Sequence, residues 1–153
     1  MERLSLAMLR RPALAGALGL LLMSGCQSMD QKAAPQASLY DRLGGQPAIT
    51  AVVDDFIGNV AADNRINGFF ANANVPRLKV LLVQQICQGT GGPCTYSGRD
   101  MQTAHRGMNI SDAQFGALVE DLVKSLDKFK VPDREKNELL AALGPMKPQI
   151  VHQ

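Results

Sequence analysis

Residues 98–110 read Gly98-Arg99-Asp100-Met101-Gln102-Thr103-Ala104-His105-Arg106-Gly107-Met108-Asn109-Ile110. This stretch holds His105, the histidine that lies in a patterned segment, whereas the other, His152, is one residue from the C-terminus. A neutral imidazole suits a borderline metal near pH 7, and one imidazole is enough where a macrocycle supplies the in-plane ligands. The alternative is a solvated or hydrogen-bonded helical histidine. The sequence on both sides of the stretch bears on this choice.

The flanking segments have the pattern of helices. Towards the N-terminus, Ser38 and Asp41 form a capping box for a very short helix, which Gly44-Gly45 can end in a left-handed conformation. Directly after the stretch, Ser111 is a helix N-cap. The helix that follows carries one apolar stripe, made of Phe115, Leu118, Val119, Leu122, Val123, Leu126 and Phe129.

Two longer helices are predicted between these. The first opens at Pro47, and its spacing leaves Asp54 and Asp55 on the solvent side. The second is capped by Asn74, and its apolar residues cover more than one stripe, so we expect it to be buried on two sides. The apolar positions of the two helices are Ile49, Val52, Val53, Phe56, Ile57 and Val60, then Leu78, Val80, Leu81, Leu82, Val83, Ile86 and Cys87.

The remaining patterned segments complete a helical domain. A last helix begins near Pro132-Asp133 and is kinked by Gly144-Pro145. It buries Leu139, Leu140 and Leu143. Phe69-Phe70 lie in an otherwise polar connection and need an apolar surface, either the core or a flat ligand. The sequence has no alternating strand pattern and no internal repeat, so we assign the fold class all-α.

Residues 1–25 have the pattern of a secretory signal, with an arginine-bearing start and an apolar run too short to span a bilayer. The end of the run, Leu22-Met23-Ser24-Gly25-Cys26, resembles the lipobox of bacterial lipoproteins, although Met23 departs from the usual Leu, Val or Ile. An ordinary export signal or an uncleaved anchor is the alternative. We expect an exported protein that a lipid on Cys26 anchors to the membrane. Gln27, in place of an Asp, favours the periplasmic face of the outer membrane.

The rest of the chain divides into a tether and one domain. The polar residues 26–37 predict a flexible tether, and residues 38–153 are enough for a single core. The chain has 16 Lys+Arg and 14 Asp+Glu, of which residues 1–25 hold three Arg and one Glu, leaving 13 of each sign. This balance gives nucleic-acid binding no electrostatic support. Cys87 and Cys94 form either a disulfide, as an oxidising compartment allows, or two buried thiols.

Several motifs occur in an order that resembles a known family. They are Leu43-Gly44-Gly45, Phe69-Phe70, Gly91-Gly92-Pro93, Tyr96-Ser97-Gly98-Arg99-Asp100-Met101, Ala104-His105-Arg106-Gly107 and Ile110-Ser111-Asp112. Their order resembles the truncated haemoglobins of the first group, over residues 38 to about 150. This resemblance implies a two-over-two helical sandwich that holds haem b. It also raises His105 from a lone histidine to a candidate iron ligand.

The resemblance also assigns site residues. His105 matches the proximal histidine, whose second ring nitrogen should donate to a backbone carbonyl. Phe70 matches the phenylalanine on the haem face, Tyr96 a tyrosine near the haem edge, and Lys79 a basic residue that meets a propionate. Met108 lines the pocket in this comparison, as does Met101, although core filling is the ordinary role of a methionine.

The chain departs from the family on the distal side. The family usually presents a tyrosine and a glutamine that donate hydrogen bonds to the gas ligand. Here these positions are Ile57 and Leu82, with Leu78 at the gate, and none of the three can donate. A charge-assisted bond of this kind contributes roughly 1.5 to 3 kcal/mol, or about 10- to 150-fold in retention. We therefore expect weak O2 stabilisation. Tyr40 is a possible donor whose position the sequence does not give.

Three hypotheses of function follow from the sequence. The first is an exported, lipid-anchored haem protein that binds a diatomic gas, O2, NO or CO, at a His105-ligated iron. The second is nitric-oxide dioxygenase or peroxide chemistry at the same iron, which needs a reductase as partner. The third is a haem-free helical lipoprotein that acts as an interaction module. Absorption spectra of the haem-loaded protein separate the third from the other two.

Overall fold

The computed structural model describes residues 36–153, so the predicted signal, Cys26 and most of the tether lie outside it. The described chain is helical, and its one β-like feature is an isolated bridge between Ile110 and Val151. The prediction of an all-α fold is confirmed. The elements, with η marking 3-10 helices, are α1 Leu39–Arg42, α2 Gly45–Ala62, η1 Asn67–Phe70, α3 Val75–Gly89, α4 Met101–His105, α5 Asp112–Lys128, α6 Asp133–Leu143 and η2 Gly144–Gln149.

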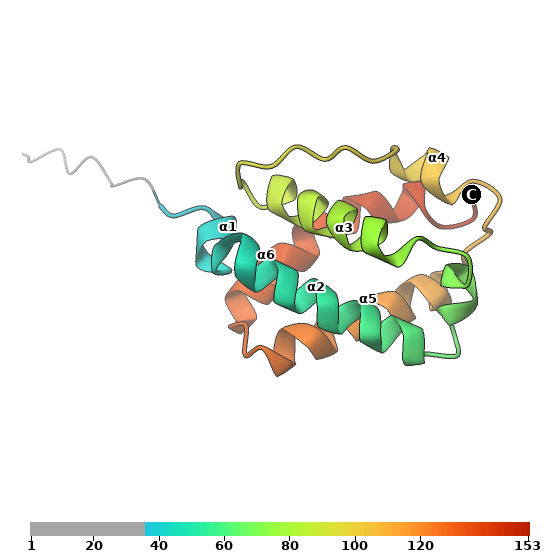
Figure 1. Cartoon of the computed structure of the whole chain (residues 1–153), viewed down its shortest axis with the longest axis horizontal. Coiled ribbons are helices and arrows are strands. Elements are labelled where there is room, and N and C mark those ends of the chain that lie inside the picture. The colour runs from blue at the N-terminus through green and yellow to red at the C-terminus, as the bar shows by residue number, and fades with distance from the viewer. Residues whose placement is uncertain (1–35) are drawn as a thin grey trace, which may run out of the picture. The chain divides into compact units, whose positions relative to one another are not determined.

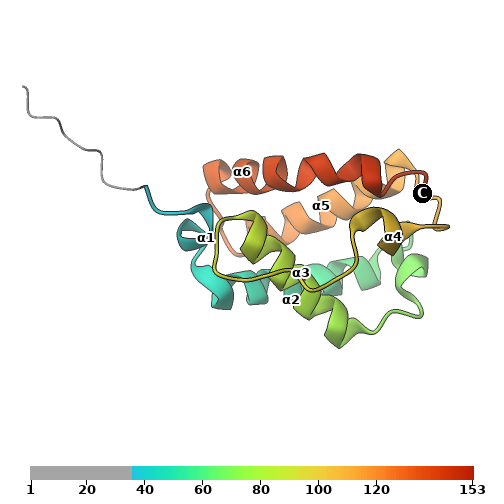
Figure 2. The same cartoon turned by 90° about the horizontal axis from the view of Figure 1, so that it is seen from above.

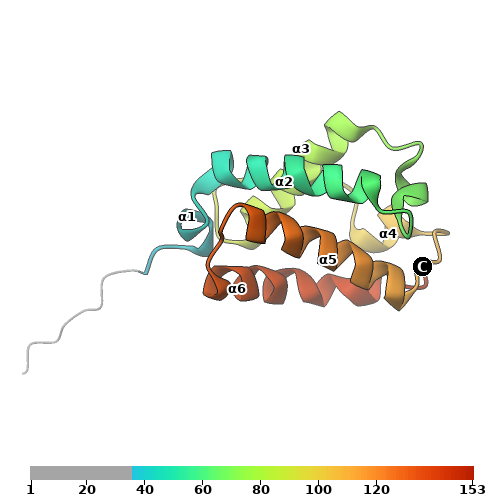
Figure 3. The same ribbon diagram turned by 90° about the horizontal axis from the view of Figure 1, so that it is seen from below.

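The long helices lie in two pairs, α2 with α3 and α5 with α6. Helix α2 makes its most extensive contacts with α3 and with α5. In Figure 1, α3 lies above α2, and α5 crosses behind α2. Helix α6 runs alongside α5, as Figures 2 and 3 show from opposite directions. Short α4 stands apart from these pairs, close to the C-terminus and next to η2.

The helix boundaries follow the predicted caps. Ser38 accepts from the Asp41 N–H, and its own N–H is accepted by the Asp41 carboxylate, which completes the capping box of α1. Gly44 and Gly45 adopt positive φ angles of 92° and 68°, as a left-handed end to α1 requires. Ser111 caps α5 with a second capping box. These local predictions are confirmed because each depends on residues only three positions apart.

The core forms where the two pairs meet. Residues of α2 supply much of it, and α3, α5 and α6 cover it. The buried cluster comprises Ile49, Val52, Val53, Phe56, Val60, Ile66, Val83, Ile86, Ala117, Leu122, Leu126 and Leu139. Phe69 and Phe70 pack against this cluster with part of their surface exposed.

Three burial predictions are wrong. On α3, Val80 belongs to the apolar positions expected to be buried but is 54% exposed, while residues 81–87 are all buried or half-buried. Phe129, the last residue of the predicted apolar stripe of α5, is 44% exposed to solvent, because the helix extends beyond the core there. Asp55 is not on the solvent side of α2: its carboxylate is half-buried and accepts from Ser125, which is itself fully buried. A polar interaction between α2 and α5 therefore lies where the spacing of the apolar residues predicted a solvent-exposed face of α2.

Cys87 and Cys94 form a disulfide, with their α carbons 5.7 Å apart. It joins the end of α3 to the long connection that leads to α4. Gly92 lies in the turn between the two cysteines, where a Cβ would come within 2.5 Å of the Tyr40 ring and 2.7 Å of Cys87 Sγ. The turn, the disulfide and the first helix are thus packed closely enough that only glycine fits.

Within residues 36–153, no helix combines the length and the apolar character that crossing a bilayer requires.

Candidate haem site

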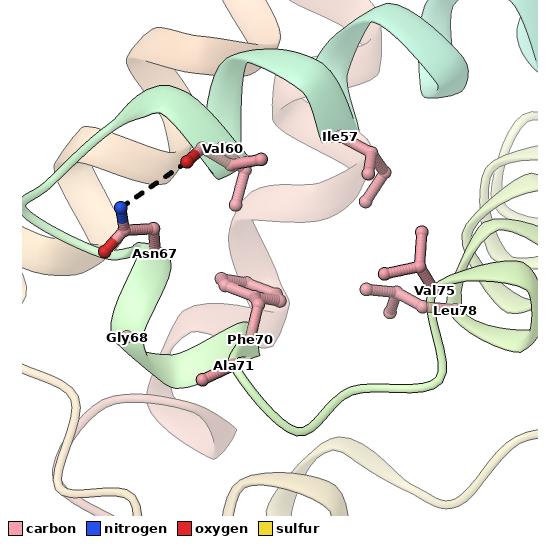
Figure 4. A pocket seen from close by; sticks show the side chains of 9 residues that line it. Ile57, Val60, Asn67, Gly68, Phe70, Ala71, Val75 and Leu78 are labelled. Carbon is pink, nitrogen blue, oxygen red and sulfur yellow. Dashed lines mark hydrogen bonds between the residues drawn. The ribbon is translucent and has the colours of Figure 1, made fainter.

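A cavity of about 350 Å³ opens between α2, η1 and the start of α3. Figure 4 shows the apolar side chains that point into it, among them Ile57, Phe70 and Leu78. The lining residues are Ile57, Val60, Ala61, Asn67, Gly68, Phe70, Ala71, Val75 and Leu78. Asn67 carries the one side-chain amide in this set. Its Nδ2 donates to the Ala61 carbonyl at 3.4 Å and to Asn64 Oδ1 at 3.3 Å, so both amide protons already have acceptors.

Local sequence features form the walls of the cavity. The Asp63 carboxylate accepts from the Arg65 guanidinium and backbone N–H in the turn after α2, and these contacts lower the pKa of Asp63 to about 2. Asn74 then caps α3 by accepting from the Arg77 N–H at 3.0 Å. Phe70 is brought to the cavity by η1 between these two turns, while part of its ring packs on the core. Of the two partners that the sequence left open for Phe70, the structure shows the core, and the flat ligand stays a prediction.

His105 is the last residue of α4 and is half-buried. Its Nδ1 lies 2.7 Å from the Met101 carbonyl oxygen. Because a carbonyl oxygen only accepts, Nδ1 carries the proton, and Nε2 is the nitrogen that remains to bind a metal. The expected hydrogen bond to a backbone carbonyl is present. Asp100 caps α4 by accepting from the Thr103 N–H at 2.8 Å, which holds the pKa of Asp100 below its usual value.

The possible metal ligands of this site suit a metal that is already bound within a macrocycle rather than a bare ion. In the described part of the chain, no three His, Cys, Asp or Glu side chains gather where they could hold a bare metal ion. One imidazole with a fixed proton, together with an apolar cavity, instead suits a group that brings its own in-plane ligands. Haem meets this requirement, because its flat apolar faces also match the phenylalanine and aliphatic walls.

The other predicted site residues are more dispersed. Ile57, Phe70 and Leu78 line the cavity together, whereas His105, Lys79, Leu82, Tyr96 and Met108 are not among its lining residues. Leu82 is half-buried and packs against the core one turn beyond Leu78. Met108 is half-buried, and its N–H donates to the His105 carbonyl at 3.0 Å in the turn after α4.

Three residues considered for the site make polar contacts outside the cavity lining, namely Lys79, Tyr96 and Tyr40. Lys79 Nζ lies 2.7 Å from Asp54 Oδ1 and so joins α3 to α2. The Tyr96 hydroxyl donates to the Arg99 carbonyl at 2.9 Å, and burial raises the pKa of Tyr96. The Tyr40 hydroxyl accepts from the Gln46 N–H at the start of α2. Tyr40 is therefore not a donor into the cavity, because its ring packs under the Gly92 turn.

Comparison with known proteins identifies the family. A family model described as bacterial-like globin matches residues 38–152. The chain belongs to this globin family. A group 1 truncated haemoglobin of Mycolicibacterium paratuberculosis is 38% identical over 120 residues, which cover 78% of this chain and 88% of that protein. A group 1 truncated haemoglobin of Tetrahymena thermophila is 34% identical over 65% of this chain and 82% of its own length. The resemblance to truncated haemoglobins is thereby confirmed.

Solved structures agree with this assignment. The truncated haemoglobin of Tetrahymena pyriformis in its Fe(III) form has a TM-score of 0.74 and 30% identity, over 76% of this chain and all of that one. The 2/2 haemoglobin of Synechococcus, solved in the cyanomet state with covalently attached haem, has a TM-score of 0.71 and 30% identity, over 75% of this chain and 98% of that one. The globin therefore has the two-over-two helical sandwich that its motifs predicted.

Three glutamines of this globin were missed at the sequence level. Gln84 Oε1 accepts from the Ser97 N–H and hydroxyl, and Gln88 Oε1 accepts from the Tyr96 N–H at 2.6 Å. Gln85 Nε2 donates to two methionine sulfurs beyond this segment. With the disulfide, these contacts fasten the connection before α4 along α3. Glutamines in an otherwise apolar helix were the available signal, but their partners lie 8 to 61 residues away, so the helical period does not identify them.

Proposed function

We propose that this globin holds haem b through His105 Nε2 and binds a diatomic gas, O2, NO or CO, beside the apolar wall of Ile57, Phe70 and Leu78. The observation that carries the proposal is the 2.7 Å contact between His105 Nδ1 and the Met101 carbonyl. It fixes the tautomer that leaves Nε2 to bind iron, and it raises the basicity of the ring. The iron of a bound haem supplies the coordination position that a diatomic gas takes.

The residues of the chain divide the remaining tasks. The Phe70 ring and the Leu78 side chain give a flat apolar ligand contact area and exclude water from it. Leu82 follows Leu78 by one turn on the same face of α3, and its place beside the gas is assigned by the family resemblance. Lys79 binds Asp54, so it reaches a haem propionate only by exchanging one carboxylate partner for another. Tyr96 and Met108 are assigned to the edge of the site by the family resemblance.

The cavity wall determines which gas is favoured. None of its lining side chains offers a free hydrogen-bond donor, since the Asn67 amide is already engaged. O2 gains from such a donor roughly 1.5 to 3 kcal/mol, whereas CO and NO depend on it less. We propose that this globin releases O2 faster than a globin with a polar distal wall. The same absence of donors argues against nitric-oxide dioxygenase activity, which requires that O2 be retained.

Absorption spectra test the proposal. Ferric and ferrous spectra of the haem-reconstituted protein should show a Soret band that changes on adding CO. In His105→Ala this band should be lost or strongly altered. His152→Ala is a matched control, because this exposed imidazole lies beside Asp112 and has no assigned role in the site, and it should keep the band. A wild-type protein without the band, or a band unchanged in His105→Ala, would favour the haem-free interaction module.

We also propose that the globin is exported and anchored by a lipid on Cys26, with residues 26–37 as the tether. The Cys87–Cys94 disulfide supports this proposal, because disulfides persist in oxidising compartments such as the periplasm. Metabolic labelling with palmitate in a bacterial host should label the wild type and not Cys26→Ser. An unlabelled protein recovered free in the periplasm would instead indicate an ordinary export signal.

A further inference from the structure

Gln85 occupies an unusual position on α3. It follows Leu78 by seven residues and Leu82 by three, so the three side chains share one face of the helix. Its half-buried amide donates from Nε2 to Met101 Sδ at 3.4 Å and to Met146 Sδ at 3.0 Å. One side chain therefore joins the distal helix α3 to α4 and to η2.

Helix α4 depends on such external contacts. It has five residues, and isolated helices of that length are not stable in water. Within α4, Met101 is the first residue and His105 the last. The carbonyl of Met101 accepts from His105 Nδ1, while its side chain accepts from Gln85. A displacement of Met101 would therefore move the group that orients the imidazole ring.

We propose that Gln85 is a positioning residue for His105, acting through Met101. The amide holds the Met101 thioether, the Met101 carbonyl holds Nδ1, and the ring thereby keeps its rotation about the Cβ–Cγ bond. A thioether is a weak acceptor, so two of them on one amide anchor it better than either alone. This inference rests on the proposed function, in which Nε2 of the same ring binds iron.

Gln84 is a matched control for Gln85. It lies next to Gln85 on α3 and also contacts the connection before α4, but its partner is Ser97. Gln85→Met and Gln84→Met each replace an amide with an unbranched side chain of similar length that has no donor. Met101→Leu removes the sulfur acceptor and keeps the backbone carbonyl, so it tests the same link from the other side.

The first measurement is hydrogen exchange in the full chain without haem. The Ala104 N–H donates to the Asp100 carbonyl within the α4 segment. In Gln85→Met its exchange should be about two- to tenfold faster, as expected from loss of one net hydrogen bond. Gln84→Met should leave it unchanged. The effects of Gln85→Met and Met101→Leu should not add, because each removes the same contact.

The second measurement is the iron–histidine stretching frequency of the ferrous haem complex. Gln85→Met should shift this frequency, since it reports the orientation and basicity of His105, whereas Gln84→Met should leave it at the wild-type value. Unchanged exchange, additive effects or an unshifted frequency in Gln85→Met would each overturn the positioning role. A wild-type protein that shows no haem complex would overturn the proposed function alone, because the exchange measurement decides the Gln85–Met101 link without haem.

Discussion

Ser125 on α5 donates its hydroxyl proton to the Asp55 carboxylate on α2 across 2.9 Å. The hydroxyl oxygen of Ser125 also accepts a hydrogen bond from Asn59 Nδ2 at 2.9 Å, and Ser125 is fully buried. Lys128 completes the cluster as the cation partner of Asp55. Helices α2 and α5 therefore meet through hydrogen bonds as well as through apolar packing.

Ser125→Ala should lower the free energy of unfolding by about 1–3 kcal/mol, because it leaves the Asn59 and Asp55 groups without their shared partner. Urea unfolding of the haem-free protein measures the difference. Thr50→Ala is the control: its exposed hydroxyl donates to the Gln46 carbonyl within α2, and its removal should change stability by less than about 0.5 kcal/mol. Equal effects of both substitutions would contradict the importance of the α2–α5 cluster.

Gly92→Ala should destabilise the fold by about 1–3 kcal/mol, since the added Cβ meets the Tyr40 ring and Cys87 Sγ. Gly58→Ala should have the opposite effect on stability. Gly58 is exposed within α2, and a Cβ there meets nothing within 4 Å, so alanine should stabilise the helix by about 0.5–1 kcal/mol. Thermal unfolding of the two variants should therefore move in opposite directions, and a shared direction would contradict the close packing of the turn.

Replacing both Cys87 and Cys94 with serine should lower the free energy of unfolding by about 2.5 kcal/mol, because the loop that the bond closes gains freedom in the unfolded chain. Reduction of the wild type should have a similar effect. Denaturant unfolding with and without a reductant measures both. A double variant as stable as the oxidised protein would show that the packing of Tyr40 and Gly92 holds this turn without the bond.

Leu78→Gln places a donor in the cavity with little change in volume. The O2 dissociation rate of the reduced, haem-loaded protein should fall by about 10- to 150-fold, while CO dissociation changes less. Val80→Gln introduces the same amide on the exposed face of α3 and should leave both rates unchanged. A wild-type O2 dissociation that is already slow, with no further slowing in Leu78→Gln, would show that a donor outside this wall serves the gas.

Asp63 makes the free energy of unfolding depend on pH in the acid range. The Arg65 guanidinium and N–H bind its carboxylate and lower the pKa of Asp63 from the ordinary 3.8 to about 2 in the folded protein. The folded state thus binds fewer protons than the unfolded state between these values, and the stabilisation present above pH 3.8 is lost as the pH falls to about 2. Unfolding measured over this range should show a shallower pH dependence in Asp63→Asn. A slope equal to that of the wild type would contradict this assignment.

The sequence by itself determined the features that depend on neighbours a few residues apart. The capping boxes of Ser38 and Ser111, the glycine end of α1 and the apolar face of α2 are of this kind. The order of short motifs around His105 also predicted the family and its two-over-two fold, since those motifs keep their spacing along the chain.

Only the tertiary structure decided which polar groups meet. Asp55 was assigned to solvent because its helix position is polar, yet α5 brings Ser125 against it from 70 residues away. Gln85 is marked locally only as a polar residue in an apolar helix, and its partners Met101 and Met146 follow from the packing of α4 and η2. Local caps are fixed by the backbone within one turn, whereas these contacts depend on how whole helices pack, which no periodicity encodes.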